Sequence, residues 1–213
     1  MKDRNKVVKI LNSWLDAKKG SPTHKHIIDV YNTIKGVPKM NYTAAWCAAT
    51  ASAAFKEAGY EDIFPCECSC GQIIEKAKKM GIWQEKDTYT PTIADAIIYA
   101  WKDDKKTYAT TDNITGHDHI GVVTSVNGNK FIVVEGNKGT PSKVGLRTMN
   151  VNGRYIRGFI TPKFDENRKK SDNDIALEVI NGLWGTGVER KKRLSEAGYD
   201  PSAIQKIVNS LLK

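Results

Sequence analysis

The chain has 213 residues, of which 40% are hydrophobic and 27% are charged, a composition typical of a folded globular protein. Its uninterrupted apolar runs reach about six residues, where a membrane-spanning helix needs about 20, so membrane insertion is excluded. The net charge of +9 favours a polyanionic partner such as nucleic acid or an anionic cell envelope. The charged N-terminus lacks the apolar block of a signal peptide, so we expect synthesis in the cytoplasm without a signal peptide.

The first part of the chain predicts helices. Apolar residues recur at helical spacing from Val7 to Leu15 and from Ile27 to Ile34, and glycine and proline end both patterns. Seven alanines between Ala44 and Ala54 predict a third helix with a thin side-chain layer, against which another element can pack closely. A fourth helix is expected from Gln72 to Met80.

From residue 96 the hydrophobic period changes to two, which predicts short strands. The expected strands are residues 96–101, 120–126, 131–135, 144–149 and 155–161. Helices followed by strands predict an α+β fold, with N-terminal helices packed on an antiparallel β-sheet. The charged stretch 163–173 predicts a linker that ends a first domain of residues 1–162.

Residues 174–213 predict a small three-helix bundle. Its helical patterns end at Asn181-Gly182 and Gly198, and Asp200-Pro201 opens the last helix. So short a domain needs its large apolar side chains for a core. The expected core residues are Trp184, Leu194, Tyr199, Val208 and Leu211. Residues 1–162 hold 23 basic and 16 acidic residues, and so carry +7 of the net charge of +9.

Cys47 lies where a cysteine is reactive. It is at or near the first turn of the alanine-rich helix, where unpaired N–H groups and the helix dipole favour the thiolate. His119 begins one predicted strand, and Glu135 and Asn137 end the next. Nucleophilic cysteine chemistry needs a base and a group that orients the base. A lone cysteine is more often a small buried hydrophobe, but these residues together favour a nucleophile.

The hairpin between the two strands decides whether His119 can reach Glu135. Paired residues of an antiparallel hairpin point to the same face. His119 therefore shares a face with Glu135 or Asn137 only if the numbers of paired residues have an even sum. A two-residue turn at Asn127-Gly128 gives an odd sum, and a three-residue loop with a left-handed Gly128 gives an even one. We therefore predict the three-residue loop, with His119 paired directly with Glu135. Gly121 on that face would leave room for the alanine-rich helix.

The segments around these residues resemble the CHAP family, papain-like cysteine amidohydrolases that cut peptidoglycan. The resemblance covers about residues 41–162 and rests on Trp46-Cys47-Ala48-Ala49, Asp118-His119-Ile120-Gly121-Val122-Val123 and Val133-Val134-Glu135-Gly136-Asn137. It implies that Cys47 is the nucleophile and His119 the general base and acid. It further implies that Glu135 orients the histidine and that Asn137 is a supporting amide.

The tail resembles the short cell-wall-binding repeat of phage lysins, because its glycines, tryptophan and basic cluster occur in the order typical of that repeat. The resemblance implies one repeat that binds muropeptide, with Trp184 and Arg190 as ligand contacts. The alternatives are that Trp184 belongs to the core and that Arg190 is a solvated helix charge.

The two resemblances imply an endolysin-like peptidoglycan hydrolase of the Gram-positive cell wall, either an N-acetylmuramoyl-L-alanine amidase or an endopeptidase. We expect a monomer that acts on the cell wall in phage or prophage lysis, without nucleic acid, cofactor or metal. The alternatives are a non-catalytic wall-binding protein and a peptidoglycan hydrolase of a mobile element.

Metal binding is the weaker hypothesis for the other polar clusters. Cys66, Cys68 and Cys70 lack the spacing of zinc ligands. A site built from His117 and His119, with His24 and His26 as further ligands, leaves the placement of Cys47 unexplained. The aspartates at 103, 104, 112 and 118 lack the alternation of a calcium-binding loop, although the CHAP resemblance keeps calcium open.

Overall fold

The computed structural model describes residues 2–85, 89–101, 116–165 and 170–212. The chain divides into two compact units, residues 1–165 and 166–213. The boundary falls three residues later than predicted, because Phe164 is buried against Phe55 and Tyr60 of the first unit. The first helix of the second unit begins at Asp172, so the predicted linker of 163–173 is too long at both ends.

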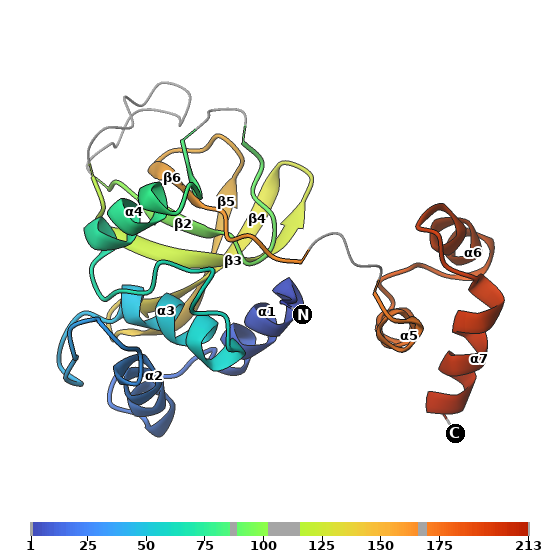
Figure 1. Ribbon diagram of the computed structural model, residues 1–213, viewed down its shortest axis with the longest axis horizontal. Coiled ribbons are helices and arrows are strands. Elements are labelled where there is room, and N and C mark those ends of the chain that lie inside the picture. Colours follow the sequence, from blue (N-terminus) through green and yellow to red (C-terminus); the bar gives the residue numbers. More distant parts are fainter. Residues whose placement is uncertain (1, 86–88, 102–115, 166–169, 213) are drawn as a thin grey trace. The chain divides into compact units, whose positions relative to one another are not determined.

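The first unit has the predicted α+β fold, with helices ahead of an antiparallel sheet (Figure 1). Its described helices are α1 (Arg4–Ser13), α2 (Pro22–Asn32), α3 (Cys47–Ala58) and α4 (Cys70–Lys79). Its described strands are β1 (Trp83–Gln84), β2 (Ala96–Tyr99), β3 (His119–Asn127), β4 (Lys130–Lys138), β5 (Lys143–Asn150) and β6 (Ile156–Ile160). These strands form a six-stranded sheet in the order β1-β6-β2-β3-β4-β5.

The start of α3 differs from those of its neighbours. α1, α2 and α4 each begin after a residue whose side chain accepts a backbone N–H: Asp3, Ser21 and Ser69. The N-cap of α3 is Trp46, and no side chain of the described residues caps this helix. The helix begins at Cys47, as expected from the predicted position of this cysteine at or near the first turn. Of the first N–H groups, that of Ala48 bonds the Cys47 sulfur, and the N-cap side chain accepts none of them.

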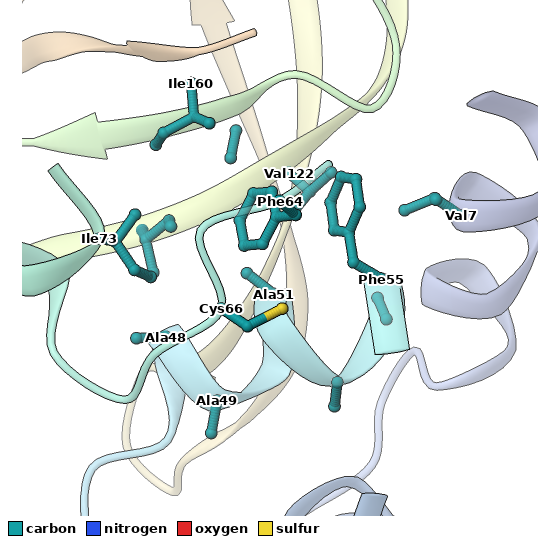
Figure 2. Close-up of a cluster of buried hydrophobic side chains, with 14 of the residues drawn as sticks. Val7, Ala48, Ala49, Ala51, Phe55, Phe64, Cys66, Ile73, Val122 and Ile160 are labelled. Atoms are coloured by element: carbon teal, nitrogen blue, oxygen red, sulfur yellow. The ribbon is translucent and has the colours of Figure 1, made fainter. Parts of the chain in front are cut away.

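α3 packs directly on β3 and β4 and lies between the sheet and α2 (Figure 1). Its alanines are buried in a cluster that includes Phe64, Val122 and Ile160 (Figure 2). The approach is closest at Gly136 of β4, where an added Cβ would lie 2.0 Å from Thr50 Oγ1. The thin layer predicted from the alanines thus sets the distance between helix and sheet.

The other face of the sheet closes over an apolar cluster of its own, formed by Ile97, Tyr99, Val123, Phe131, Val133, Ile156 and Phe159. The rings of Phe131 on β4 and Phe159 on β6 have centroids 6.1 Å apart, although β2 and β3 lie between these strands. In a flat sheet, three strand spacings would separate them by about 14 Å. The sheet is therefore strongly curled around this second core.

The second unit is the predicted three-helix bundle, with α5 (Asp172–Ile180), α6 (Gly187–Glu196) and α7 (Pro201–Leu211). Its core residues are Ile175, Ala176, Val179, Leu194, Tyr199, Ile204 and Val208. The prediction that Leu211 belongs to the core is wrong. Leu211 is the last residue of α7, one turn beyond the core residue Val208, and is 51% exposed. None of the described helices of the chain is both long and apolar enough to span a bilayer.

Replacing Gly136 with alanine should destabilise the first unit by about 1–3 kcal/mol, the usual cost of overpacking a core, because the new methyl group collides with Thr50. Thermal unfolding followed by circular dichroism measures the effect. Gly145→Ala in the neighbouring strand is the matched control, since its added Cβ would meet the flexible Lys138 side chain at 3.0 Å. Equal melting temperatures of the two variants would contradict the close contact between α3 and β4.

Candidate functional site

The hairpin between β3 and β4 has a two-residue turn, so the predicted three-residue loop is wrong. Residues 128 and 129 form the turn. From there as far as Ser125, the numbers of paired residues have an odd sum. A bulge at Thr124 then shifts the register, so that Val123 pairs with Val133. The bulge restores the even register that places the histidine of β3 and the glutamate of β4 on one face. Local turn chemistry did not reveal the bulge, which lies inside the strand.

His119 and Glu135 meet as diagonal neighbours rather than as a direct pair. Continuing the register places Glu135 opposite Gly121, where an added Cβ would lie 2.8 Å from Glu135 Cγ. The carboxylate reaches past the glycine to His119, with 3.4 Å between Oε2 and Nε2. Gly121 therefore makes room for Glu135, and the clearance for α3 comes from Gly136 instead.

Cys47 is the first residue of α3, and its sulfur interacts with the Cys70 thiol and with His119. The bond with the Cys70 thiol lowers the pKa of Cys47 against the effect of burial, and with the contribution of His119 the value is about 5. Burial by itself would lower the pKa of His119, but hydrogen bonds with Cys47 and Glu135 raise it to about 9. Between about pH 5 and pH 9 the pair is therefore a thiolate and an imidazolium.

Glu135 is fully buried and contacts three cationic side chains among the described residues. Arg147 donates two hydrogen bonds, with 2.5 Å from Nε to Oε1 and 3.0 Å from Nη2 to Oε2. Lys138 Nζ lies 3.5 Å from Oε2, and His119 is the third partner. Burial alone would raise the pKa of Glu135, but the hydrogen bonds from His119 and Arg147 lower it to about 2. The carboxylate is therefore ionised across the neutral pH range.

An aromatic stack flanks this charge network. The rings of Tyr99 and Trp101 are stacked, with centroids 4.5 Å apart, and the His119 ring lies 5.7 Å from that of Tyr99. The guanidinium of Arg147 lies 4.8 Å from the centre of the Trp101 ring. Neither Arg147 nor this stack is predicted by the sequence pattern. The one available signal was an arginine within a strand predicted to be half-buried.

Asn137 connects the end of β4 to the start of α3. It adopts a left-handed conformation, with φ of 54°, and its Oδ1 accepts a hydrogen bond from Ser142 Oγ at 2.9 Å. Ser142 Oγ in turn accepts a bond from Trp46 Nε1 at 3.1 Å. Trp46 directly precedes Cys47, so this chain of bonds holds the start of α3 against the sheet. The supporting role of the Asn137 amide in catalysis stays a prediction.

Comparison with known protein families finds one match in each of the two units. Residues 38–137 match the CHAP domain, and residues 173–212 match the CW_7 repeat. This chain carries a CHAP domain and a CW_7 repeat. The residues at the predicted catalytic positions all fall within the CHAP match: Cys47, His119, Glu135 and Asn137. Arg147 of β5 lies outside it.

Two individual proteins are similar to parts of the chain. A protein named Lysozyme from Streptococcus phage Cp-7 is 54% identical over 47 residues, which are 22% of this chain and 14% of that protein. The chain thus matches a small part of this relative's length. The crystal structure of Ly7917 is matched over 75% of this chain and 62% of that one, with 11% identity and a TM-score of 0.43, which is too low to establish a shared fold.

The remaining cysteines lie in three different environments. Cys66 is buried, and its thiol lies 3.8 Å from a backbone carbonyl oxygen of α3. The Cys68 thiol lies 3.5 Å from Oε1 of Glu67. Cys70 begins α4 and contacts the Cys47 sulfur, which raises the pKa of Cys70. The sequence pattern assigns no role to Cys70, and the structure places it beside Cys47 in the candidate site.

The histidines proposed as metal ligands do not converge. His24 packs edge-on against Trp46, with ring centroids 4.6 Å apart, and His26 pairs with Glu57. His117 lies against Gly71 of α4. Within the described parts of the chain, no three His, Cys, Asp or Glu side chains form a cluster that could hold a metal ion. The aspartates at 103, 104 and 112 lie outside the described residues.

The CW_7 repeat contains a hollow of about 340 Å³. Its lining residues are Gly187, Arg190, Lys191, Leu194, Pro201, Ser202, Gln205, Lys206 and Asn209. Arg190 is held in the lining of the hollow by two hydrogen bonds. Its Nε donates to Gly185 O at 3.0 Å, and its Nη1 donates to Gln205 Oε1 at 3.3 Å. Trp184 packs against the Tyr199 ring, and its Nε1 donates to Glu178. The structure therefore places Arg190 at the hollow and Trp184 at the edge of the core.

Alkylation of Cys47 by iodoacetamide should show a midpoint near pH 5, because the thiolate is the reacting form and its pKa is lowered to about 5. Mass spectrometry of the labelled peptides, at a series of pH values, measures the rate for each cysteine. His119→Asn and Cys70→Ala should each move the midpoint upward. Cys66 is the internal control, since burial raises its pKa to about 12 and it should stay unlabelled at neutral pH. A wild-type midpoint at the ordinary thiol value of 9.0 would contradict the ion pair.

Proposed function

We propose that this chain is a peptidoglycan hydrolase that cleaves an amide bond of the bacterial cell wall through Cys47, while its CW_7 repeat binds the wall. The observation that carries the proposal is the thiolate, imidazolium and carboxylate series of Cys47, His119 and Glu135 inside a CHAP domain. The CW_7 repeat and the phage protein named Lysozyme support the cell wall as the substrate. A wall-binding protein without activity would need no such series.

Acylation begins with attack of the Cys47 thiolate on the amide carbonyl carbon. The carbon–sulfur bond forms, and the oxyanion of the tetrahedral intermediate faces the first N–H groups of α3, which no side chain of the described residues caps. Nε2 of His119 faces Glu135, which leaves Nδ1 for the reacting groups. Nδ1 gives its proton to the leaving nitrogen, the carbon–nitrogen bond breaks, and a thioester and a free amine result.

Deacylation uses the same groups in the opposite sense. The neutral imidazole of His119 takes a proton from water, and the resulting hydroxide attacks the thioester carbon. The carbon–sulfur bond breaks, and Cys47 leaves as a thiolate beside the restored imidazolium. One water molecule is consumed, and the products are a carboxylate and an amine. Glu135 keeps its charge throughout and orients the ring.

The bond that is cut distinguishes two activities. An N-acetylmuramoyl-L-alanine amidase separates the peptide stem from the sugar, and an endopeptidase cuts within the stem or the cross-bridge. Both reactions are amide hydrolyses that the same three residues support. We propose the general reaction, and mass spectrometry of digested walls identifies the bond from the new ends.

Wall binding by the tail is assigned to the hollow that contains Arg190. One repeat offers one binding site, so the affinity is modest and gains nothing from avidity. Trp184 does not line the hollow. It supports the binding site by packing against Tyr199 in the bundle.

Replacing Cys47 with alanine should abolish the release of amide-cleavage products from Gram-positive cell walls while leaving wall binding intact, because the nucleophile is lost and the tail is unchanged. Mass spectrometry of soluble fragments measures cleavage, and co-sedimentation with insoluble walls measures binding. Cys68→Ala is the matched control, since Cys68 is half-buried and contacts Glu67 rather than His119. Undiminished cleavage by the Cys47→Ala variant would refute the proposed mechanism.

Arg190→Ala should weaken binding to purified walls about tenfold, equivalent to about 1.4 kcal/mol, because a polar donor of the hollow is removed. The comparison variant is Lys192→Ala, which removes the same charge from α6 but does not line the hollow. Titration of isolated wall fragments by calorimetry gives both affinities. If both variants lose the same affinity, net charge rather than the hollow governs binding.

A further inference from the structure

Glu135 has more charged partners than the orientation of a histidine requires. Its Oε2 lies 3.0 Å from Arg147 Nη2, 3.4 Å from His119 Nε2 and 3.5 Å from Lys138 Nζ. Its Oε1 accepts a further bond from Arg147 Nε at 2.5 Å. The glutamate side chain is fully buried, whereas that of Arg147 is 31% exposed. The arginine therefore connects the buried carboxylate with the surface of the CHAP domain's unit.

Arg147 is held by contacts on several sides. Its backbone pairs with Val133 of β4, which lies two residues before Glu135. Its guanidinium lies 4.8 Å from the centre of the Trp101 ring and 5.5 Å from that of Tyr99. The planar guanidinium gives two parallel hydrogen bonds to the carboxylate, which fix its orientation as well as its charge. A lysine in this place would supply the charge without the second bond.

The proposed reaction changes the charge of His119 twice. As an imidazolium, the ring compensates the charge of Glu135. After it has given its proton to the leaving amine, the ring is neutral and the carboxylate must be compensated by other groups. An unpaired buried carboxylate is strongly unfavourable, and its field would hold the proton on the imidazole. Arg147 stays charged at every relevant pH and already bonds both oxygens.

We propose that Arg147 is a positioning residue of the catalytic site, which keeps Glu135 ionised and aimed at His119 while the imidazole is neutral. The inference rests on the proposed function of Cys47 and His119. It extends the catalytic unit to β5, beyond the residues that match the CHAP domain. Arg147 acts through Glu135 and does not contact the substrate.

The other described titratable groups around the pair come from several elements: Cys47 of α3, Cys70 of α4, Tyr99 of β2, Lys138 of β4 and Asp118 beside His119. The Asp118 carboxylate accepts the Trp101 backbone N–H at 2.7 Å. Lys138 supplies a single amine at 3.5 Å from one oxygen of Glu135, without the paired geometry of the guanidinium. Arg147 is therefore the group whose removal should most change the charge that Glu135 presents to His119.

The test compares Arg147→Gln, Arg147→Lys and Arg157→Gln. The pKa of His119 is measured by NMR titration of the histidine Cε1–H signals, assigned with His119→Asn. The kcat for wall hydrolysis is measured in parallel across the same pH range. Arg157 is the matched control, because it lies in the same sheet, sits 5.3 Å from the centre of the Trp83 ring and pairs with Glu85.

Arg147→Gln should raise the pKa of His119 from about 9 by about one unit, because a nearby positive charge is lost and the whole charge of Glu135 acts on the ring. The kcat should fall about tenfold, since the imidazolium releases its proton less readily. Arg147→Lys should keep the pKa near the wild-type value and lose a smaller part of kcat. Arg157→Gln should lower the melting temperature and leave the pKa of His119 unchanged.

An unchanged pKa of His119 in folded Arg147→Gln would overturn the proposal. If that variant does not fold, Arg147→Lys decides, because a wild-type kcat in this variant would show that the paired hydrogen bonds are not needed. The NMR titration does not depend on hydrolysis. A wild-type protein that fails to cut walls would therefore refute the proposed function, while the effect of Arg147 on His119 is still measured independently.

Discussion

The contact between Thr50 of α3 and Gly136 of β4 sets the position of Cys47. Cys47 lies one turn before Thr50, and Gly136 directly follows Glu135, so one close contact brings the start of α3 and the end of β4 together. The hydrogen-bonded chain from Trp46 through a serine to Asn137 secures the same junction from the other side. A side chain at position 136 would separate α3 from the sheet and move Cys47 away from the histidine.

The charges of the site alternate in sign from Cys47 through His119 and Glu135 to Arg147. Each buried charge is thus next to an opposite one, which offsets the cost of removing it from water. The shifts in pKa follow the same order, downward for Cys47 and Glu135 and upward for His119. A site of this kind keeps a nucleophilic thiolate at neutral pH without exposing it fully to solvent.

The folding unit is larger than the part of the chain that matches the CHAP domain. Arg4 of α1 bonds the fully buried Asp95 carboxylate, with 3.0 Å from Nη1 to Oδ1, and its guanidinium lies 4.6 Å from the centre of the Phe164 ring. Both ends of the unit therefore meet at Arg4, which also bonds the residue that precedes β2. The flanking segments hold the strands that carry His119 and Glu135, and β5 among them carries Arg147.

The sequence by itself determined the features that depend on neighbours along the chain. Helical and strand periods, the thin alanine helix and the placement of Cys47 at its start are local properties. Only the tertiary structure decided the register of β3 on β4, because the bulge at Thr124 is selected by what the two strands bury and not by the turn. The partnership of Arg147 with Glu135 likewise arises from strand pairing, since a buried carboxylate takes its countercharge from whichever residue the sheet brings beside it.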